Sequence, residues 1–237
     1  MPYKNIRLSV IIPALNEEKY IPYTINGLKN QSFKGFETIV VDGNSKDKTR
    51  DIAKRGATVI IQKKKGMSIA RNSGAKISKG EVLLFLDADT EPSKDLLALY
   101  NNAFKDPNVV AATGPLAPLE KTTRIIRLFY ALDSVYLKKL SFFFRRPKIS
   151  ACNFAVRKTV FYKVHGFKNE YATYEGYDLS DRLKNYGKFI YINDAVVKTS
   201  IRRVVKWGVI SYILFRIVNT VRYDITKKPE ENYEIIR

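Results

Sequence analysis

Two aspartates separated by one residue follow an apolar run of the sequence. Residues 82–86 are bulky and apolar, as in a buried strand, and Asp87 and Asp89 come directly after them. Carboxylate oxygens are the ligands that Mg²⁺ or Mn²⁺ prefers when the ion also binds a diphosphate. An isolated Asp-x-Asp more often caps a helix, here one that would begin near Pro92, but the preceding apolar strand favours a metal site.

Polar residues follow other apolar runs in the same way. Residues 13–18 read Pro-Ala-Leu-Asn-Glu-Glu, Asp42 ends a second run, and Arg71 lies in a glycine-bounded stretch at residues 66–74. Ligands of open α/β sheets bind outside the carboxyl ends of the strands, so we expect these residues to share one site. Asp42 can accept hydrogen bonds from a nucleobase or ribose, although Asp-Gly also favours a tight turn. Arg71 offers a planar cation near a nucleotide, or a surface salt bridge.

Two more carboxylates lie three residues apart in the second half of the chain. Glu175 and Asp178 can share one face of a helix, where a carboxylate could take a proton from a hydroxyl group. Asp178 could instead form an ion pair with Arg182, four residues further on. A third polar candidate is Asn153, in a strand-like stretch at residues 151–156.

The elements that must position these residues alternate along the first half. Short runs rich in β-branched residues at 8–12, 38–41, 58–61 and 82–86 are typical of buried strands, and they are separated by stretches of helical length at 17–31, 46–55 and 67–78. This alternation predicts a doubly wound α/β fold with a mixed, mostly parallel sheet.

The second half has a different character. At residues 122–144 apolar residues recur at spacings of three and four, which predicts an amphipathic helix. Residues 204–223 are apolar almost all round, with Arg216 and Asn219 inside the segment, and the uncharged stretch is too short to span a bilayer. We therefore expect C-terminal amphipathic helices that lie at a membrane interface.

The positive charge is concentrated in these two regions. The chain carries 42 Lys and Arg against 23 Asp and Glu, and residues 121–150 and 198–228 each hold eight basic residues against one acidic residue. Basic residues mixed with bulky apolar ones suit an anionic membrane surface better than a nucleic acid. One cysteine and one histidine exclude an internal disulfide and a His/Cys zinc site. With no signal peptide apparent at the N-terminus, we expect a cytoplasmic protein peripherally associated with the cell membrane.

Taken together, the motifs resemble those of family 2 glycosyltransferases. The resemblance is carried by residues 13–18, 42–49, 66–74, 87–89, 150–158 and 174–183. It implies the A-type nucleotide-sugar fold and inverting transfer of a sugar from a UDP- or GDP-sugar. It divides the chain into a catalytic domain at 1–198 and a membrane-interface segment at 199–237. Within the domain, residues 1–120 would bind the nucleotide sugar and residues 121–198 the acceptor.

The resemblance also assigns roles to single residues. It implies that Asp89 binds Mg²⁺ or Mn²⁺, that Asp87 contacts ribose or metal, and that Asp42 contacts the nucleobase. Further contacts to the nucleotide sugar are expected from Pro13, Ala14, Leu15, Glu17, Arg71 and Ala88, and contacts on the acceptor or diphosphate side from Asn153, Arg202 and Arg203. Gly176 departs from the pattern, because an aspartate that serves as base often follows the glutamate. The base could then be Glu175 or Asp178, or an ionised phosphate acceptor could need none.

The membrane-like segments favour a lipid acceptor, either a polyprenyl phosphate or a lipid-linked glycan. The alternatives are the same chemistry on a soluble protein or small-molecule acceptor, and a nucleotidyltransferase, whose Gly-rich, Lys-containing first loop is not found at residues 13–18. Nucleic acid is not an expected partner, because the basic clusters lie on apolar helices.

Overall fold

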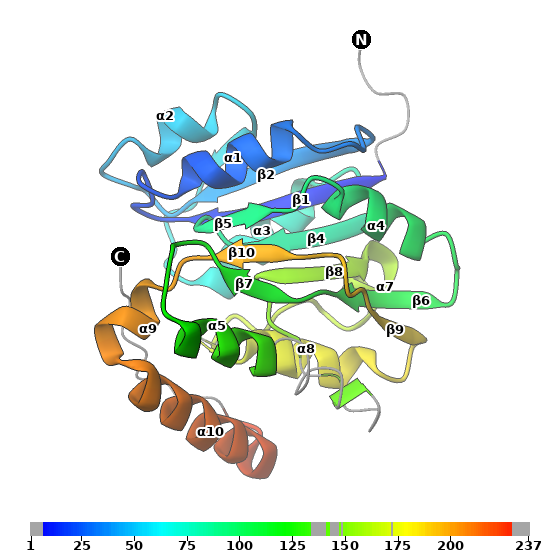
Figure 1. Ribbon diagram of the computed structural model, residues 1–237. Coiled ribbons are helices and arrows are strands. Elements are labelled where there is room, and N and C mark those ends of the chain that lie inside the picture. Colours follow the sequence, from blue (N-terminus) through cyan, green and yellow to red (C-terminus); the bar gives the residue numbers. More distant parts are fainter. Residues whose placement is uncertain (1–6, 134–140, 143–146, 148, 172, 229–237) are drawn as a thin grey trace.

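The computed structural model describes residues 7–133, 141–142, 147, 149–171 and 173–228, and these residues form a layered α/β domain (Figure 1). Within them, a seven-stranded sheet has the order β3-β2-β1-β4-β8-β6-β9, and a three-stranded sheet has the order β5-β10-β7. The strands are β1 (Leu8–Ala14), β2 (Phe36–Asp42), β3 (Thr58–Ile61), β4 (Val82–Leu86), β5 (Thr90–Pro92), β6 (Val109–Thr113), β7 (Leu116–Pro118), β8 (Asn153–Arg157), β9 (Lys188–Tyr191) and β10 (Val197–Thr199).

The large sheet is mixed and mostly parallel, as predicted. Strands β3, β2, β1 and β4 are mutually parallel, whereas β8 runs antiparallel to both β4 and β6. The predicted bounds of β3 and β4 are confirmed. The parallel strands end at the same edge of the sheet, so the residues that follow β1, β2 and β4 are brought to one side of the molecule.

Side chains alternate between the two faces along each strand, and helices cover both faces of the sheet. Val10 and Leu84 belong to a cluster that includes α1 (Ile21–Lys29) and α4 (Leu96–Ala103). Ile11 and Phe85 face the opposite way, towards α3 (Met67–Ile77), α7 (Lys158–Lys163) and α8 (Glu175–Leu183). Strands buried on both faces explain the near-continuous apolar runs of the sequence. A short helix, α2 (Thr49–Ala53), follows β2.

The small sheet connects the C-terminal segment to the residues after β4. Strand β10 pairs antiparallel with β5 and parallel with β7, and the backbone N–H of Ser200 then donates to the carbonyl oxygen of Asp89 at 3.0 Å. Residues 200–203 are thereby held beside the aspartates that the sequence singled out.

The segments predicted to lie at a membrane differ in detail from the expectation. The predicted helix at 122–144 is described as α5 (Arg124–Ala131), and most of the remainder lies outside the described residues. The predicted segment at 204–223 consists of α9 (Arg202–Trp207) and α10 (Val209–Thr226), separated at Gly208, whose φ of +79° favours glycine. Helices α5 and α10 lie together below the sheet in Figure 1. In the described part of the chain, no helix is long and apolar enough to cross a membrane.

Candidate active site

A cavity of about 300 Å³ lies beyond the ends of β1 and β4. Its walls come from these strand ends, from the start of α8, and from α5, α9 and α10. Nine of the residues proposed from the sequence line it among those that the structure describes: Pro13, Glu17, Arg71, Asp87, Ala88, Asp89, Glu175, Arg202 and Arg203. The fold therefore brings together residues up to 190 positions apart in the chain.

Arg71 links the residues that follow β4 to the start of α8. Its guanidinium donates to Oδ1 of Asp87 at 2.7 Å and to Oε1 of Glu175 at 2.6 Å, and its side chain is only 1% exposed. Burial alone would lower the pKa of Arg71, but the charges of Asp87 and Glu175 outweigh it and raise the pKa. Arg71 is thus a fixed cation that holds a carboxylate from β4 and one from α8 in place.

Arg202 makes a second bridge of the same kind. It forms two hydrogen bonds with the carboxylate of Glu17, at 2.8 and 2.6 Å, and lies 3.1 Å from Oδ2 of Asp89. Burial and the neighbouring charges of Asp87 and Glu17 raise the pKa of Asp89 to about 7, although Arg202 acts in the opposite direction. Burial is the largest cause of this shift, and the carboxylates of Asp87 and Glu17 add to it.

The same residues fit a divalent cation that is also bound by a substrate. Asp87 and Asp89 supply oxygen ligands of the kind that Mg²⁺ and Mn²⁺ prefer, and both line the cavity together with Glu17. Among the described residues, no three His, Cys, Asp or Glu side chains converge as a ready-made metal site. Such an ion would complete its coordination with water or with oxygens of a bound diphosphate.

Glu120, which was not among the residues predicted from the sequence, stabilises the turn that precedes Arg202. Its carboxylate accepts hydrogen bonds from Oγ of Ser200 at 2.7 Å and from the backbone N–H of Ile201 at 2.9 Å. Helix α9 begins at the next residue. An isolated glutamate after β7 carries no local pattern that would reveal this role.

The close approach of two backbone segments explains Gly176. A Cβ atom at this position would overlap the carbonyl oxygen of Ile149 and would lie 3.1 Å from the backbone nitrogen of Ala151. Tyr174, just before α8, adopts a left-handed conformation with φ of +57°. The start of α8 therefore lies directly against residues 149–151, and a side chain at position 176, where the family pattern has an aspartate, would require the backbone to shift.

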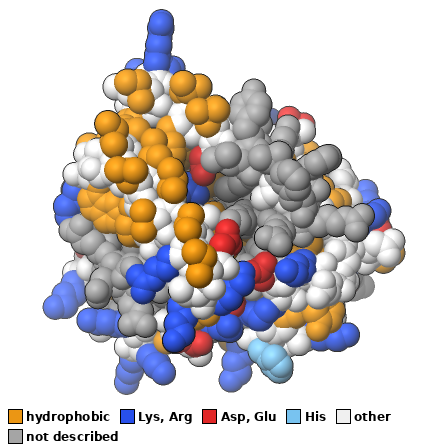
Figure 2. Space-filling view, turned by 90° about the horizontal axis from the view of Figure 1, so that it is seen from below, with side chains coloured by type: hydrophobic (Ala, Val, Ile, Leu, Met, Phe, Trp, Pro, Cys, Tyr) orange, Lys and Arg blue, Asp and Glu red, His pale blue; other side chains and the backbone are white. Residues whose placement is uncertain are grey.

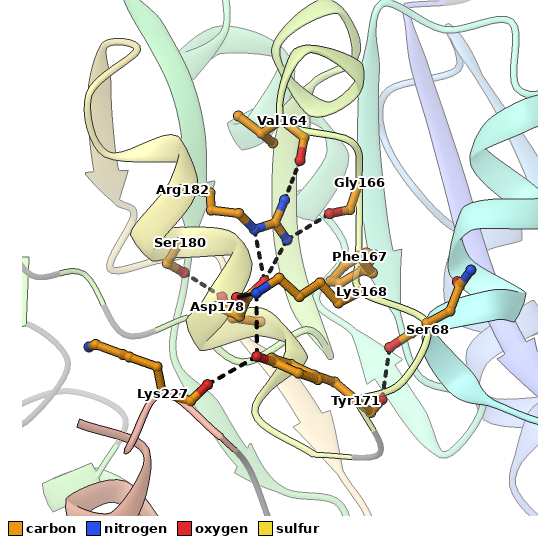
Figure 3. A network of polar contacts seen from close by, with 12 residues as sticks. Ser68, Val164, Gly166, Phe167, Lys168, Tyr171, Asp178, Ser180, Arg182 and Lys227 are labelled. Carbon is orange, nitrogen blue, oxygen red and sulfur yellow. Dashed lines mark hydrogen bonds and ion pairs between the residues drawn. The ribbon is translucent and has the colours of Figure 1, made fainter. Parts of the chain in front are cut away.

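Asp178, the other candidate base, points away from the cavity and into a network of polar contacts (Figure 3). Its carboxylate accepts hydrogen bonds from Nε and an Nη of Arg182 at 2.8 and 2.6 Å, and lies 2.9 Å from Nζ of Lys168. Arg182 also donates to the carbonyl oxygens of Val164 and Gly166. This is the ion pair that the sequence offered as the alternative for Asp178.

The network continues to the C-terminal helix through Tyr171. The hydroxyl of Tyr171 donates to the carbonyl oxygen of Lys227 at the end of α10, and its own carbonyl oxygen accepts from Ser68 in α3. As Figure 3 shows, one loop thus joins three helices that are distant in the sequence.

Four other expected residues lie outside the cavity lining: Ala14, Leu15, Asp42 and Asn153. The buried carboxylate of Asp42 accepts hydrogen bonds from Arg50 at 3.1 and 2.8 Å and from the backbone N–H of Ser45. The side chain of Asn153 is bonded to Tyr100 and to the carbonyl oxygen of Ala195. In this structure Asp42 and Asn153 therefore hold the protein's own groups, and their binding roles stay predictions.

The far half of the cavity consists of residues that the sequence did not assign to a site. Arg216 in α10 forms an ion pair with Asp133 at 2.6 Å, and both line the cavity together with Phe129, Tyr130, Tyr177, Tyr212 and Phe215. The signal in the sequence was Arg216 itself, because a charged residue within an apolar helix seldom faces lipid.

Comparison with known proteins agrees with this geometry. Over 211 residues the chain is 28% identical to the probable glycosyltransferase YdaM of Bacillus subtilis, a match that spans 81% of this chain but only 50% of YdaM. It is 36% identical over 107 residues to the amylovoran biosynthesis glycosyltransferase AmsB of Erwinia amylovora, which is 40% of this chain and 34% of AmsB.

Solved structures share the fold at lower identity. TarS of S. aureus superposes with a TM-score of 0.66 at 20% identity, covering 95% of this chain and 41% of TarS. The mannosyltransferase PcManGT of Pyrobaculum calidifontis, solved with GDP-Man and Mn²⁺, has a TM-score of 0.64 at 18% identity, covering 92% of this chain and 66% of PcManGT. The family model for glycosyl transferase family 2 matches residues 9–165, and with the strand-end carboxylates gathered around one cavity, the chain belongs to that family.

Proposed function

We propose that the protein transfers a sugar, with inversion, from a UDP- or GDP-sugar to a lipid acceptor at a membrane surface, with the help of Mg²⁺ or Mn²⁺. The observation that carries the proposal is the single cavity in which Asp87, Asp89 and Glu17 meet Arg71 and Arg202. Related folds have been solved with UDP, UDP-GlcNAc and GDP-Man, which supports a nucleotide sugar as the donor.

The charge of the cavity supports the need for a cation. Among the described residues that line it, five are Asp or Glu and four are Arg, so the cavity carries a small negative formal charge before any substrate enters. A nucleoside diphosphate sugar adds more negative charge. A divalent ion held by Asp87 and Asp89 would neutralise the diphosphate as it leaves.

The roles of the protein's own groups follow from their contacts. Arg202 and Arg203 lie on the side of Asp89 and are the cations available to diphosphate oxygens. Glu175 lines the cavity and is oriented by Arg71. We therefore assign it the role of the base that takes the proton from the attacking hydroxyl group. We do not assign this role to Asp178, because it lies outside the cavity lining, in ion pairs with Arg182 and Lys168.

The outer face of α10 supports a membrane location for the acceptor. Its inward side carries Tyr212, Arg216, Asn219 and Tyr223, whereas its aliphatic side chains point outward. The exposed apolar side chains on this face and on α5 are Ile125, Leu128, Leu132, Ile210, Leu214, Ile217, Val218, Val221 and Ile225. Helices of water-facing surfaces have the opposite arrangement. Figure 2 shows hydrophobic side chains gathered on the face that carries these helices, with Lys and Arg around them.

The donor half is tested with a panel of UDP- and GDP-sugars, each with Mg²⁺, with Mn²⁺ or with chelator. We expect at least one sugar to bind and to be hydrolysed slowly in a metal-dependent manner, and Asp89→Asn to lose both effects. Equal binding of that sugar in chelator would remove the metal from the proposal, and inert behaviour towards every donor would overturn it.

The membrane half is tested by flotation with vesicles of neutral or anionic lipid. A variant with Ile210→Asn, Leu214→Asn and Ile217→Asn should float much less than the wild type. A matched control with Ile61→Asn and Ile77→Asn, two aliphatic residues that are 55% and 42% exposed elsewhere, should float normally. Equal flotation of all three proteins would instead favour a soluble acceptor.

A further inference from the structure

The aromatic half of the cavity has the composition of a carbohydrate site, and we propose that it is the acceptor subsite. It would bind a neutral pyranose ring, as in a lipid-linked saccharide, rather than a bare phosphate group, with Asp133 and Arg216 holding the ring's hydroxyl groups. This inference rests on the proposed function and specifies its acceptor.

The ion pair offers both kinds of hydrogen bond that a sugar needs. Nη1 of Arg216 lies 2.6 Å from Oδ2 of Asp133, and the two side chains are 25% and 16% exposed, so each retains some surface towards the cavity. A carboxylate accepts from hydroxyl groups, and a guanidinium donates to hydroxyl oxygens. Planar polar groups in a largely desolvated pocket discriminate strongly between ligands that carry the matching hydroxyl and those that lack it.

Aromatic rings surround this pair. Tyr130, Tyr177, Tyr212 and Phe215 line the same part of the cavity, and the rings of Phe129 and Tyr212 pack edge to face at 5.7 Å. Rigid aromatic side chains provide a large apolar surface with little loss of conformational entropy, and Tyr adds a polar hydroxyl group. A pyranose ring has apolar C–H faces and a polar rim, which matches such a lining.

The charges in the cavity disfavour a phosphate acceptor. Arg216 is paired with Asp133, so among the described residues this ion pair itself contributes no net positive charge for a dianion. The donor half already has to accommodate a diphosphate beside Glu17, Asp87 and Asp89. A second phosphate would add charge of the same sign in a partly desolvated site, whereas a sugar adds none.

Helix α10 is attached to the start of α8 by contacts other than the ion pair between Asp133 and Arg216. The hydroxyl of Tyr174 donates to the carbonyl oxygen of Arg216 and lies 3.1 Å from Oγ1 of Thr220, while its ring stacks on Tyr223 at 6.0 Å. Buried ion pairs are a weak source of stability compared with apolar residues of similar volume. The position of Asp133 and Arg216 in the cavity wall therefore indicates recognition.

The experiment uses the chain's one tryptophan as a reporter. Trp207 packs against Phe215 at 5.0 Å and Tyr212 at 6.3 Å, so its fluorescence should respond to a ligand in this half. The full-length protein is titrated with a panel of hexyl pyranosides and with hexyl phosphate, which share the same tail. We expect saturable changes with at least one pyranoside and none with the phosphate.

Four variants separate recognition from fastening. Asp133→Asn and Arg216→Met should each weaken binding of the pyranoside about tenfold or more, the loss typical of one charged hydrogen-bond partner. Tyr212→Leu should do the same through loss of the ring. Asp181→Asn is the matched control, because Asp181 pairs outside this cavity with Lys227, the residue that follows α10, and it should bind like the wild type.

Opposite results overturn the inference: saturable binding of hexyl phosphate alone, no pyranoside binding at all, or weakening by Asp181→Asn equal to that by Asp133→Asn. If a single charge change prevents folding, Asp133→Asn combined with Arg216→Met removes both charges and takes its place. Slow donor hydrolysis without acceptor is measured in parallel. Its loss would count against the proposed function, whereas retained hydrolysis with no pyranoside binding would count only against the acceptor subsite.

Discussion

Arg71→Met should destabilise the protein substantially, because Arg71 is the common partner of two carboxylates. Its side chain is 1% exposed, that of Glu175 is 10% exposed and that of Asp87 is 29% exposed. Removal of one partner from a buried pair costs about 3–5 kcal/mol. Because Asp87 is partly solvated, we expect about 3 kcal/mol, which for a chain of this size lowers the Tm by roughly 6–12 °C.

Companion variants give this prediction its internal checks. Arg71→Lys keeps the charge but lacks the fork that reaches both carboxylates, so its loss should be about half as large. Glu175→Gln should restore part of the stability lost in Arg71→Met, because one orphaned charge is removed. Lys198→Met breaks the exposed pair with Glu91 and should change the unfolding free energy by about 0.5 kcal/mol or less.

Urea and thermal unfolding of the four proteins measure these differences. Unchanged stability in Arg71→Met would contradict the view that Arg71 neutralises the two carboxylates. Equal losses for Arg71→Met with and without Glu175→Gln would show that the contact with Glu175 contributes nothing.

Other predictions follow from single residues. The pKa of Asp89 is raised to about 7 in the folded protein, whereas that of an unfolded Asp is near 4. Without metal, the unfolding free energy should therefore fall as the pH rises from about 4 to about 7, because only the folded state still holds the proton. Asp89→Asn should flatten that dependence. Donor binding with Mn²⁺ should strengthen over the same range, because the ion competes with the proton. Gly176→Ala should lose about 1–3 kcal/mol in urea unfolding through overlap with the backbone, and a stable variant would refute that packing. Glu175→Gln should lower kcat roughly 10²-fold, whereas Asp178→Asn should lower the Tm and largely spare kcat; the reverse pattern would exchange their roles.

The sequence predicted the strands of the first half of the chain well, because local signals coincide there. Strands buried on both faces give continuous apolar runs, and functional carboxylates such as Asp87 and Asp89 follow them directly. The bounds of β3 and β4 could be read from composition alone. The order of the strands and the antiparallel insertion of β8 depend on long-range pairing, to which no local pattern corresponds.

The second half of the chain was harder to predict, because its contacts join residues that are distant in the sequence. Arg202 and Glu17 are 185 positions apart, and no sequence pattern around either residue predicts their contact. The apolar stripe predicted for residues 122–144 is divided between two environments: Ile125 and Leu132 are exposed, whereas Phe129 packs edge to face against Tyr212. A helix with apolar residues on both sides has no period that identifies its partner.

The match to the family model ends at residue 165, whereas the cavity continues to Arg216. The strand ends proposed to bind the donor lie inside the matched region, whereas the proposed acceptor subsite combines Asp133, which lies inside it, with Tyr212 and Arg216, which lie beyond it. A chimaera designed to take a new acceptor would then have to exchange residues 124–133 as well as the segment from residue 173 onward. The contacts of Arg71 with Glu175 and of Arg202 with Glu17 would mark the junctions that such chimaeras have to preserve.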